Sequence, residues 1–303
     1  MSSFKDLRIV DNFYQTSSFF PMPTIVVGTL SESGKTNLGS YSLCFPYYIA
    51  GKEYYAMILE CRNSSNTAQN ILRGSRVSLN FITDERKFFR EAVRLGFPGD
   101  TTDEKMKNCL FTLEDGIAGG DNRPKVVKEA YQVFECSWDG TLEDAYLDKP
   151  GCLEGYEPPY RNFNGITSKF GAHFILKIDK ILMKEKYYDS IINGVKAGNF
   201  PPVPVDYGYR DSTNFWCSAF RKPYPEKIPA KDGDVSSVMY AAKRIDPDVT
   251  FTDEACAKLT KIPRIFLKAA LSQMVAIAKE EGITVIDEQA LEIINDKRRK
   301  EKK

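Results

Sequence analysis

The sequence predicts a β-rich α+β fold with flanking helices, followed by a small C-terminal α-helical module. Short β-branched and aromatic runs, separated by Gly, Pro, Ser and Asn, recur over roughly the first two-thirds of the chain and are typical of strands. Apolar residues spaced three and four apart then predict helices near the C-terminus. A chain of 303 residues can form one large domain or two unequal ones.

Two strand predictions rest on clear patterns. Residues 24–30 are rich in β-branched side chains and precede the turn-forming residues 31–34. Residues 76–82 alternate polar and apolar side chains, as expected for a half-buried strand. Further strands are predicted at 54–60, 127–138 and 172–183. Prolines exclude a regular helix from the segment 200–210, which is expected to be extended and irregular.

Helices are predicted beside these strands and in the C-terminal module. Thr67 is expected to cap a short helix that ends at Gly74. Apolar residues at helical spacing predict a helix over 84–95. Further helices are expected near 187–194 and in the C-terminal module, with starts at Thr252, Pro263 and Asp287.

The domain organisation follows from these patterns. Residues 1–229 form the predicted β-rich domain, and the polar segment 230–246 is the predicted linker. Residues 247–298 form the predicted helical module, and residues 299–303 form a solvated basic tail.

The composition of the chain argues against several classes of function. The chain has 42 Lys and Arg against 41 Asp and Glu, which gives no general attraction to nucleic acid or to acidic membranes. Its seven cysteines lack CxxC pairs and metal-finger spacing, so no metal site is predicted and reduced thiols in the cytoplasm are expected. No apolar run is long enough to cross a bilayer, so neither export nor membrane insertion is expected.

Two polar segments could hold a cofactor. Residues 62–67 combine a cation, hydroxyls, amides and a helix start, which together would satisfy a phosphate monoester. Asn37, Ser40 and Ser42 follow the first predicted hairpin, and alternate hydroxyl groups on one side could contact the edge of a planar ring. The alternative is that these Asn and Ser residues only form turns and caps.

The order of these segments resembles the flavin reductase-like split-barrel family. The carrying residues are Pro21-Met-Pro-Thr-Ile-Val-Val-Gly-Thr-Leu30, Asn37-Leu-Gly-Ser-Tyr-Ser42, Arg62-Asn-Ser-Ser-Asn-Thr-Ala-Gln-Asn-Ile71 and the V-x-x-N pattern that ends at Asn80. The resemblance implies an antiparallel, Greek-key split β-barrel that binds FMN. It also implies a homodimer in which each subunit helps to enclose the flavins.

Carried over by residue, the resemblance implies two groups of FMN-binding positions. The flavin is expected near Thr29, Asn37, Ser40, Tyr41 and Ser42. Its phosphate is expected near Arg62, Ser64, Ser65 and Thr67. Asn70 and Asn80 also match motif positions, and their role could be limited to supporting the loop.

The resemblance continues more loosely through residues 127–131 and 171–176. His173 is the only histidine, and it could border the flavin or nicotinamide site or could be a hydrogen-bonded structural residue. Where the family has Gly-Glu-Val, this chain has Lys177-Ile178-Asp179, which puts family-specific details of the nicotinamide side in doubt.

We therefore expect an FMN-dependent oxidoreductase that passes electrons from NADH, NADPH or a protein donor to flavin, iron or another acceptor. The flavin itself would perform the chemistry. One alternative is an FMN electron carrier that docks a protein redox partner without NAD(P)H turnover. Another is a non-catalytic flavin-binding protein, because a fold does not establish an activity.

The C-terminal segment carries a second resemblance. An acidic helix start after Thr252, the sequence Lys261-Ile-Pro and a Gly282-Ile turn are similar to the end of light-independent protochlorophyllide reductase B subunits. The rest of such a reductase is absent from this sequence. The resemblance therefore implies a shared helical module and no chlorophyll chemistry.

Overall fold

The chain divides into two compact units in a computed structural model. The N-terminal unit is Met1–Pro225 and the C-terminal unit is Glu226–Lys303. The structure describes residues 22–48, 55–96, 101–120, 122–142, 163–193, 200–210, 215–219 and 235–301.

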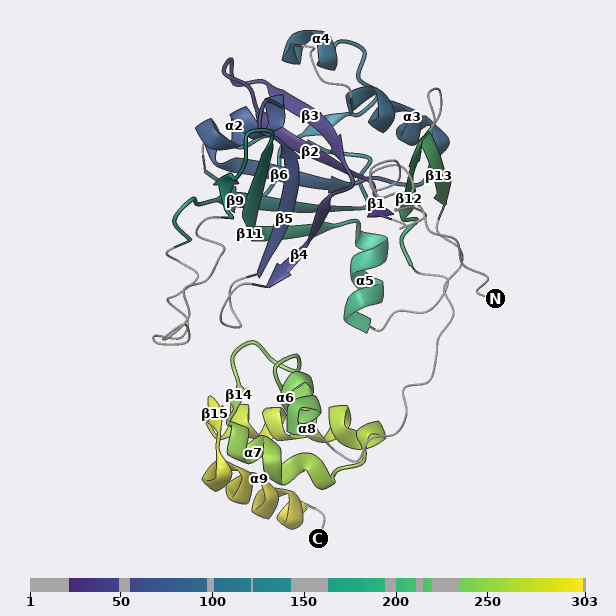
Figure 1. The fold of residues 1–303 in the computed structure, drawn as a ribbon. Helices are drawn as coiled ribbons and strands as arrows, with labels where there is room; N and C mark the ends of the chain where they lie inside the picture. The colour runs from purple at the N-terminus through teal and green to yellow at the C-terminus, as the bar shows by residue number, and fades with distance from the viewer. Residues whose placement is uncertain are drawn as a thin grey trace, which may run out of the picture. The chain divides into compact units, whose positions relative to one another are not determined.

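An eight-stranded antiparallel sheet forms the N-terminal unit (Figure 1). The strand order is β3-β2-β6-β9-β11-β5-β4, and β10 pairs with β11. The sheet curls into a half-barrel, which confirms the predicted β-rich α+β fold with helices. Its strands are β2 (Ile25–Leu30), β3 (Thr36–Tyr41), β4 (Cys44–Tyr48), β5 (Tyr55–Arg62), β6 (Arg76–Phe81), β9 (Gln132–Trp138), β10 (Gly165–Ile166) and β11 (Gly171–Met183).

Smaller strand pairs accompany this sheet. The strands β7 (Leu113–Glu114) and β8 (Val126–Val127) pair with each other. A three-stranded sheet has the order β1-β12-β13, with bounds Met22–Pro23, Pro204–Arg210 and Phe215–Ala219.

The main sheet is buried on both faces because strand side chains alternate between two cores. On β2, Ile25 and Val27 join the core inside the curl, together with Leu59, Phe174 and Leu176. On the other face, Val26 joins a second core. That outer core also contains Leu38, Ile82, Phe88, Ala92, Leu95, Phe111 and Val127.

Helices cover both cores. Helix α2 (Asn66–Gly74) contributes Ala68 and Ile71 to the inner core. Helix α3 (Arg86–Leu95) covers the outer core through Phe88, Ala92 and Leu95. The remaining helices of this unit are α4 (Thr102–Met106) and α5 (Glu185–Asn193).

The start of α2 differs from the prediction that Thr67 caps this helix. Ser65 is the N-cap: its backbone is extended, and its hydroxyl accepts a hydrogen bond from the Ala68 amide at 3.1 Å. Thr67 lies inside the first turn and is buried. The capping residue is therefore two positions earlier than the sequence pattern indicated.

One strand prediction also needs correction. The predicted strand 127–138 is interrupted, because residues 128–131 form a turn between β8 and β9. The segment 200–210, expected to be extended and irregular, contains the strand β12, whose pairing with β13 shifts in register between Asp206 and Arg210. Pro204 is its first residue, a position where the missing N–H group of proline is tolerated.

The predicted half-buried strand 76–82 is β6, and its polar residues Ser78 and Asn80 are buried as well. Asn80 is 0% exposed. Its Nδ2 atom donates to the Val26 carbonyl at 2.9 Å, and its Oδ1 atom accepts from the Val127 amide at 2.8 Å. Asn80 therefore joins β6 to a neighbouring strand and to the segment that covers the outer core.

A second buried polar residue joins α3 to the following loop. The Glu91 Oε2 atom accepts a hydrogen bond from Arg94 Nε at 3.0 Å, and its Oε1 atom accepts one from the Leu110 amide at 3.3 Å. Burial alone would raise the pKa of Glu91, but hydrogen bonds from Arg94 and Cys109 and the charge of Arg94 lower it below its usual value overall. The folded unit therefore favours the ionised carboxylate.

Glu91→Gln is expected to lower the free energy of unfolding at pH 7 by about 1–2 kcal/mol, because a charge-assisted interaction is lost. Since folding lowers the pKa of Glu91, its stabilisation is present above the ordinary glutamate range and is lost as pH falls through the folded pKa. The difference between variant and wild type should shrink below about pH 4. Urea unfolding from pH 7 to pH 3 measures this, with the exposed Glu114→Gln as the control. A constant difference across this range would contradict the prediction.

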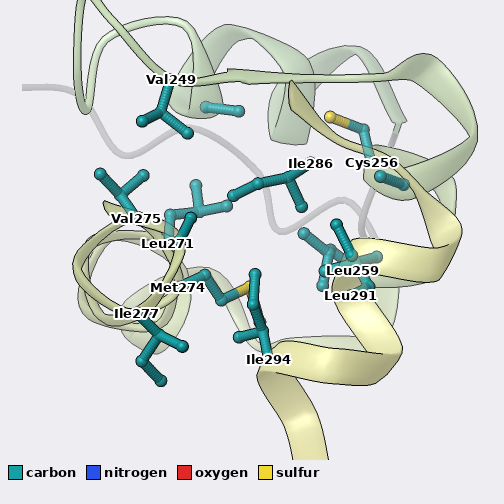
Figure 2. Close-up of a cluster of buried hydrophobic side chains, with 14 of the residues drawn as sticks. Val249, Cys256, Leu259, Leu271, Met274, Val275, Ile277, Ile286, Leu291 and Ile294 are labelled. Atoms are coloured by element: carbon teal, nitrogen blue, oxygen red, sulfur yellow. The ribbon is translucent and has the colours of Figure 1, made fainter. Parts of the chain in front are cut away.

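The C-terminal unit has its own apolar core (Figure 2). Leu271, Met274 and Val275 line one side, and Ile286, Leu291 and Ile294 pack against them. The elements are α6 (Val235–Ala242), β14 (Thr250–Phe251), α7 (Asp253–Lys258), the 3-10 turn η4 (Leu259–Lys261), α8 (Arg264–Glu280), β15 (Val285–Ile286) and α9 (Glu288–Glu301). Thr252 caps α7 as predicted, by accepting a hydrogen bond from the Ala255 amide at 3.2 Å.

Two boundaries in this unit differ from the sequence-based expectation. Helix α6 lies inside the predicted linker 230–246, and its Val238 and Ala242 side chains belong to the C-terminal core. Helix α9 continues to Glu301, so it includes part of the predicted basic tail 299–303. Among the helices that the structure describes, none is long and apolar enough to span a bilayer.

Candidate functional site

The loop between β5 and α2 gathers polar groups on a short path. Arg62 ends β5, and the chain then turns through Ser64 to the cap Ser65. The side chains of Arg62 and Ser64 are exposed, whereas Thr67 is buried under the first turn of α2. That first turn contains no acidic residue. The positive end of the helix dipole and the Arg62 guanidinium therefore favour an anion here.

Tyr41, at the end of β3, belongs to the same cluster. Burial and the nearby Cys61 raise the pKa of Tyr41, although hydrogen bonds with Thr67 and Ser65 lower it in part. The phenol is therefore neutral and can both donate and accept hydrogen bonds. Burial likewise raises the pKa of Cys61 to about 11, so its thiol is protonated.

Close packing between β3 and α2 fixes this cluster. A Cβ atom added to Gly39 would lie 2.9 Å from Thr67 Oγ1 and 3.0 Å from Tyr41 Cε2. Both distances are too short for ordinary contact, so a glycine is required for the strand to approach the helix.

Thr29 and Asn37 face each other across β2 and β3 and are both 0% exposed. Thr29 Oγ1 accepts a hydrogen bond from Asn70 Nδ2 at 3.0 Å. Asn37 Oδ1 accepts one from the Thr102 hydroxyl at 3.3 Å. Asn37 Nδ2 is buried and has no hydrogen-bond partner among the residues that the structure describes. An unpaired buried donor is costly, so this amide is available to a further acceptor.

Ser40 and Ser42 are separated from Asn37. Because strand side chains alternate, Asn37, Gly39 and Tyr41 share one face of β3 and Ser40 lies on the other. Ser42 follows the last residue of β3, and both serines are partly exposed. The structure thus brings Tyr41 to the loop 62–67 and places Asn37 and Ser40 on opposite faces of β3.

Asn63 is a residue of this site that sequence reasoning missed. Its Nδ2 atom donates to the Lys169 carbonyl at 2.8 Å, and its amide donates to the Phe170 carbonyl at 3.1 Å. Its own carbonyl accepts from Gln69 Nε2 at 2.7 Å. Asn63 therefore holds the loop 62–67 against both α2 and the hairpin between β10 and β11. No local sequence signal distinguishes it from an ordinary turn residue.

His173 lies on β11, directly across from Glu60 on β5. Its Nδ1 atom is 2.5 Å from the Thr167 hydroxyl, and its Nε2 atom is 3.6 Å from Glu60 Oε1. Phe163 stacks on the ring with a centroid distance of 4.0 Å. The imidazole is thus fixed in orientation between a hydroxyl and a carboxylate.

The residues of the loop 62–67 have the chemistry that a phosphate group requires. They supply a cation, hydroxyl groups and a helix start without a competing carboxylate in the first turn. The unpaired Asn37 amide and the glycine-dependent approach of β3 to α2 add a polar, closely packed hairpin beside this loop.

Comparison with solved structures finds proteins similar to this chain. A flavoredoxin from Methanosarcina acetivorans aligns with a TM-score of 0.50 and 14% identity, over 75% of this chain and 97% of that chain. A 2-nitrobenzoate 2-nitroreductase from Pseudomonas fluorescens gives 0.49 and 16%, over 74% and 95%. The flavin reductase of styrene monooxygenase from Pseudomonas putida S12 gives 0.46 and 10%, over 71% and 99%.

Sequence comparisons add no family assignment. No protein-family model matches this chain. No curated protein sequence matches it significantly. The resemblance of residues 247–298 to protochlorophyllide reductase B subunits is without support in these comparisons. At 14% identity, the flavoredoxin establishes the fold alone: a curled antiparallel half-barrel of the split-barrel kind found in flavin reductases and flavoredoxins.

Proposed function

We propose that this chain binds FMN and acts as an oxidoreductase that transfers electrons from NADH, NADPH or a protein donor to flavin, iron or another acceptor. The observation that carries the proposal is the cluster of the Tyr41, Ser65 and Thr67 hydroxyls at the start of α2, in the loop that begins with Arg62, on a fold shared with a flavoredoxin. A cluster of this chemistry at a helix start suits a phosphate group.

In this proposal the phosphate binds at the loop 62–67. The Arg62 guanidinium supplies charge, and the hydroxyls of Ser64, Ser65 and Thr67 supply directional hydrogen bonds. Tyr41 and the partly exposed Ser40 and Ser42, at the end of β3, would hold the flavin ring. The buried pair Thr29 and Asn37 holds the β2–β3 hairpin behind it.

The chemistry divides between cofactor and protein. Bound FMN would supply the capacity to accept and release one or two electrons. The residues of this chain bind the phosphate, orient the ring and exclude water from its buried edge. Tyr41 is neutral and can donate a hydrogen bond to a ligand oxygen or nitrogen.

A second candidate is an FMN electron carrier without NAD(P)H turnover. The likeness to a protein named flavoredoxin, and not flavin reductase, favours it. Under either proposal we expect a homodimer, because an open half-barrel leaves loops exposed that a second copy can cover. The carrier additionally needs a protein redox partner.

An anaerobic absorbance titration with FMN, followed by NADH and then NADPH, tests the proposal. Uptake of FMN and its rapid bleaching by either nucleotide would support the oxidoreductase. Uptake without bleaching would favour the carrier or a protein donor. A spectrum of FMN that is unchanged by the protein would overturn both.

A further inference from the structure

His173 occupies a hydrogen-bonded chain whose donors and acceptors must change when the ring gains a proton. In the neutral ring, only one nitrogen carries a hydrogen. The arrangement with Nε2–H directed at Glu60 leaves Nδ1 to accept from the Thr167 hydroxyl. In the protonated ring both nitrogens donate, so Thr167 becomes an acceptor and Glu60 gains an ion-pair partner.

The hydrogen-bonded side chains of Thr167, His173 and Glu60 are connected to the loop 62–67 in two ways. Glu60 and Arg62 are two residues apart on β5 and therefore lie on the same face of the strand. On the neighbouring β11, His173 pairs with Glu60 and Gly171 pairs with Arg62. Thr167 belongs to the β10–β11 hairpin whose carbonyl groups bind Asn63.

The charges around His173 give the direction of the coupling. From β5 it faces the Glu60 carboxylate, with the Arg62 guanidinium further along the same face. The hairpin contributes Lys169, whose side chain is exposed. The paired residues of β10, Gly165 and Ile166, carry no charge. Glu60 is therefore the negative group that opposes an anion at Arg62, and a protonated His173 would neutralise it.

We propose that protonation of His173 strengthens binding of a phosphate-bearing flavin at the loop 62–67, so that this histidine makes cofactor affinity dependent on pH. The inference rests on the proposed FMN site. When His173 is neutral, the Glu60 carboxylate offsets the positive field of Arg62. When His173 is charged, Glu60 pairs with it, and the electrostatic potential at the loop 62–67 is more favourable for an anion.

The thermodynamic linkage between proton binding at His173 and FMN binding provides a direct experiment. If a proton on His173 favours FMN, then FMN must favour the proton by the same factor. Because His173 is the only histidine in the chain, its ring signal in a ¹H–¹³C NMR titration of untagged protein needs no assignment by mutation. Saturating FMN should raise the titration midpoint by about 0.3–1 pH unit, equivalent to a two- to tenfold change in affinity. Riboflavin, which lacks the phosphate, should leave the midpoint unchanged.

Variants separate this coupling from a structural role. In Glu60→Gln, the opposing charge is gone, so FMN should bind about two- to tenfold tighter near pH 8. Thr167→Val keeps Glu60 and should retain the effect of FMN on the midpoint, which also shows that the hairpin still folds.

Two results would overturn the inference, and they are distinguishable. If both flavins bind and FMN leaves the His173 midpoint unchanged, the coupling is absent while the flavin site stands. If neither FMN nor riboflavin binds at any pH, the proposed function fails and the inference fails with it.

Discussion

Replacing Asn80 with alanine is expected to lower the free energy of unfolding of the N-terminal unit by about 2–4 kcal/mol. The Asn80 side chain is fully buried and bonds to the Val26 carbonyl and the Val127 amide. Alanine would leave the Val127 amide without this acceptor and would open a cavity between the sheet and its cover. Buried backbone groups without partners are among the costly defects of a fold.

Urea unfolding followed by tryptophan fluorescence measures this loss, because Trp138 lies on β9 next to β6. The control is Asn295→Ala, which makes the same substitution at an exposed position of α9. It should change the stability of the chain by less than about 0.5 kcal/mol. Equal losses in the two variants would mean that the buried hydrogen bonds of Asn80 contribute little.

Asn80 also shows where sequence reasoning succeeded and where it failed. The alternation around residues 76–82 correctly predicted a strand, since the period of two is set by the backbone. The same alternation predicted an exposed polar face, and this was wrong. Whether a polar face meets water depends on what packs over it, and here residues 122–131 arrive from a distant part of the chain.

The boundary errors have the same origin. The run 127–138 looks like one strand in composition, but the turn at 128–131 exists because Val127 must bond to Asn80 while β9 pairs with β6. The polar segment 230–246 looks like a linker, yet two of its apolar residues, Val238 and Ala242, find a core among the C-terminal helices. Both outcomes depend on tertiary contacts that local patterns do not contain.

For the candidate site, the sequence predicted which segments come together better than how their side chains point. The helix start at 62–67 and Tyr41 do meet, because β3 and α2 pack closely at Gly39. Asn37 and Ser40 are three residues apart and therefore lie on opposite faces of β3. The roles of these residues toward FMN stay predictions.

Arg62→Ala is expected to weaken FMN binding by about 10- to 100-fold, or about 1.5–3 kcal/mol, through loss of a charge-assisted contact to the phosphate. Riboflavin has no phosphate, so its affinity should be nearly the same in variant and wild type. The ratio of the two dissociation constants therefore isolates the contact at Arg62 from any change in the ring site. Flavin fluorescence titration at fixed salt measures both constants.

Two matched variants sharpen this experiment. Arg86→Ala removes an exposed arginine at the start of α3 and should leave the ratio unchanged. Arg62→Lys keeps the charge but not the planar pair of donors, so it should recover only part of the FMN affinity. If Arg62→Ala weakened FMN and riboflavin equally, the arginine would act on the fold or on the ring. The phosphate would then have to be sought away from the loop 62–67.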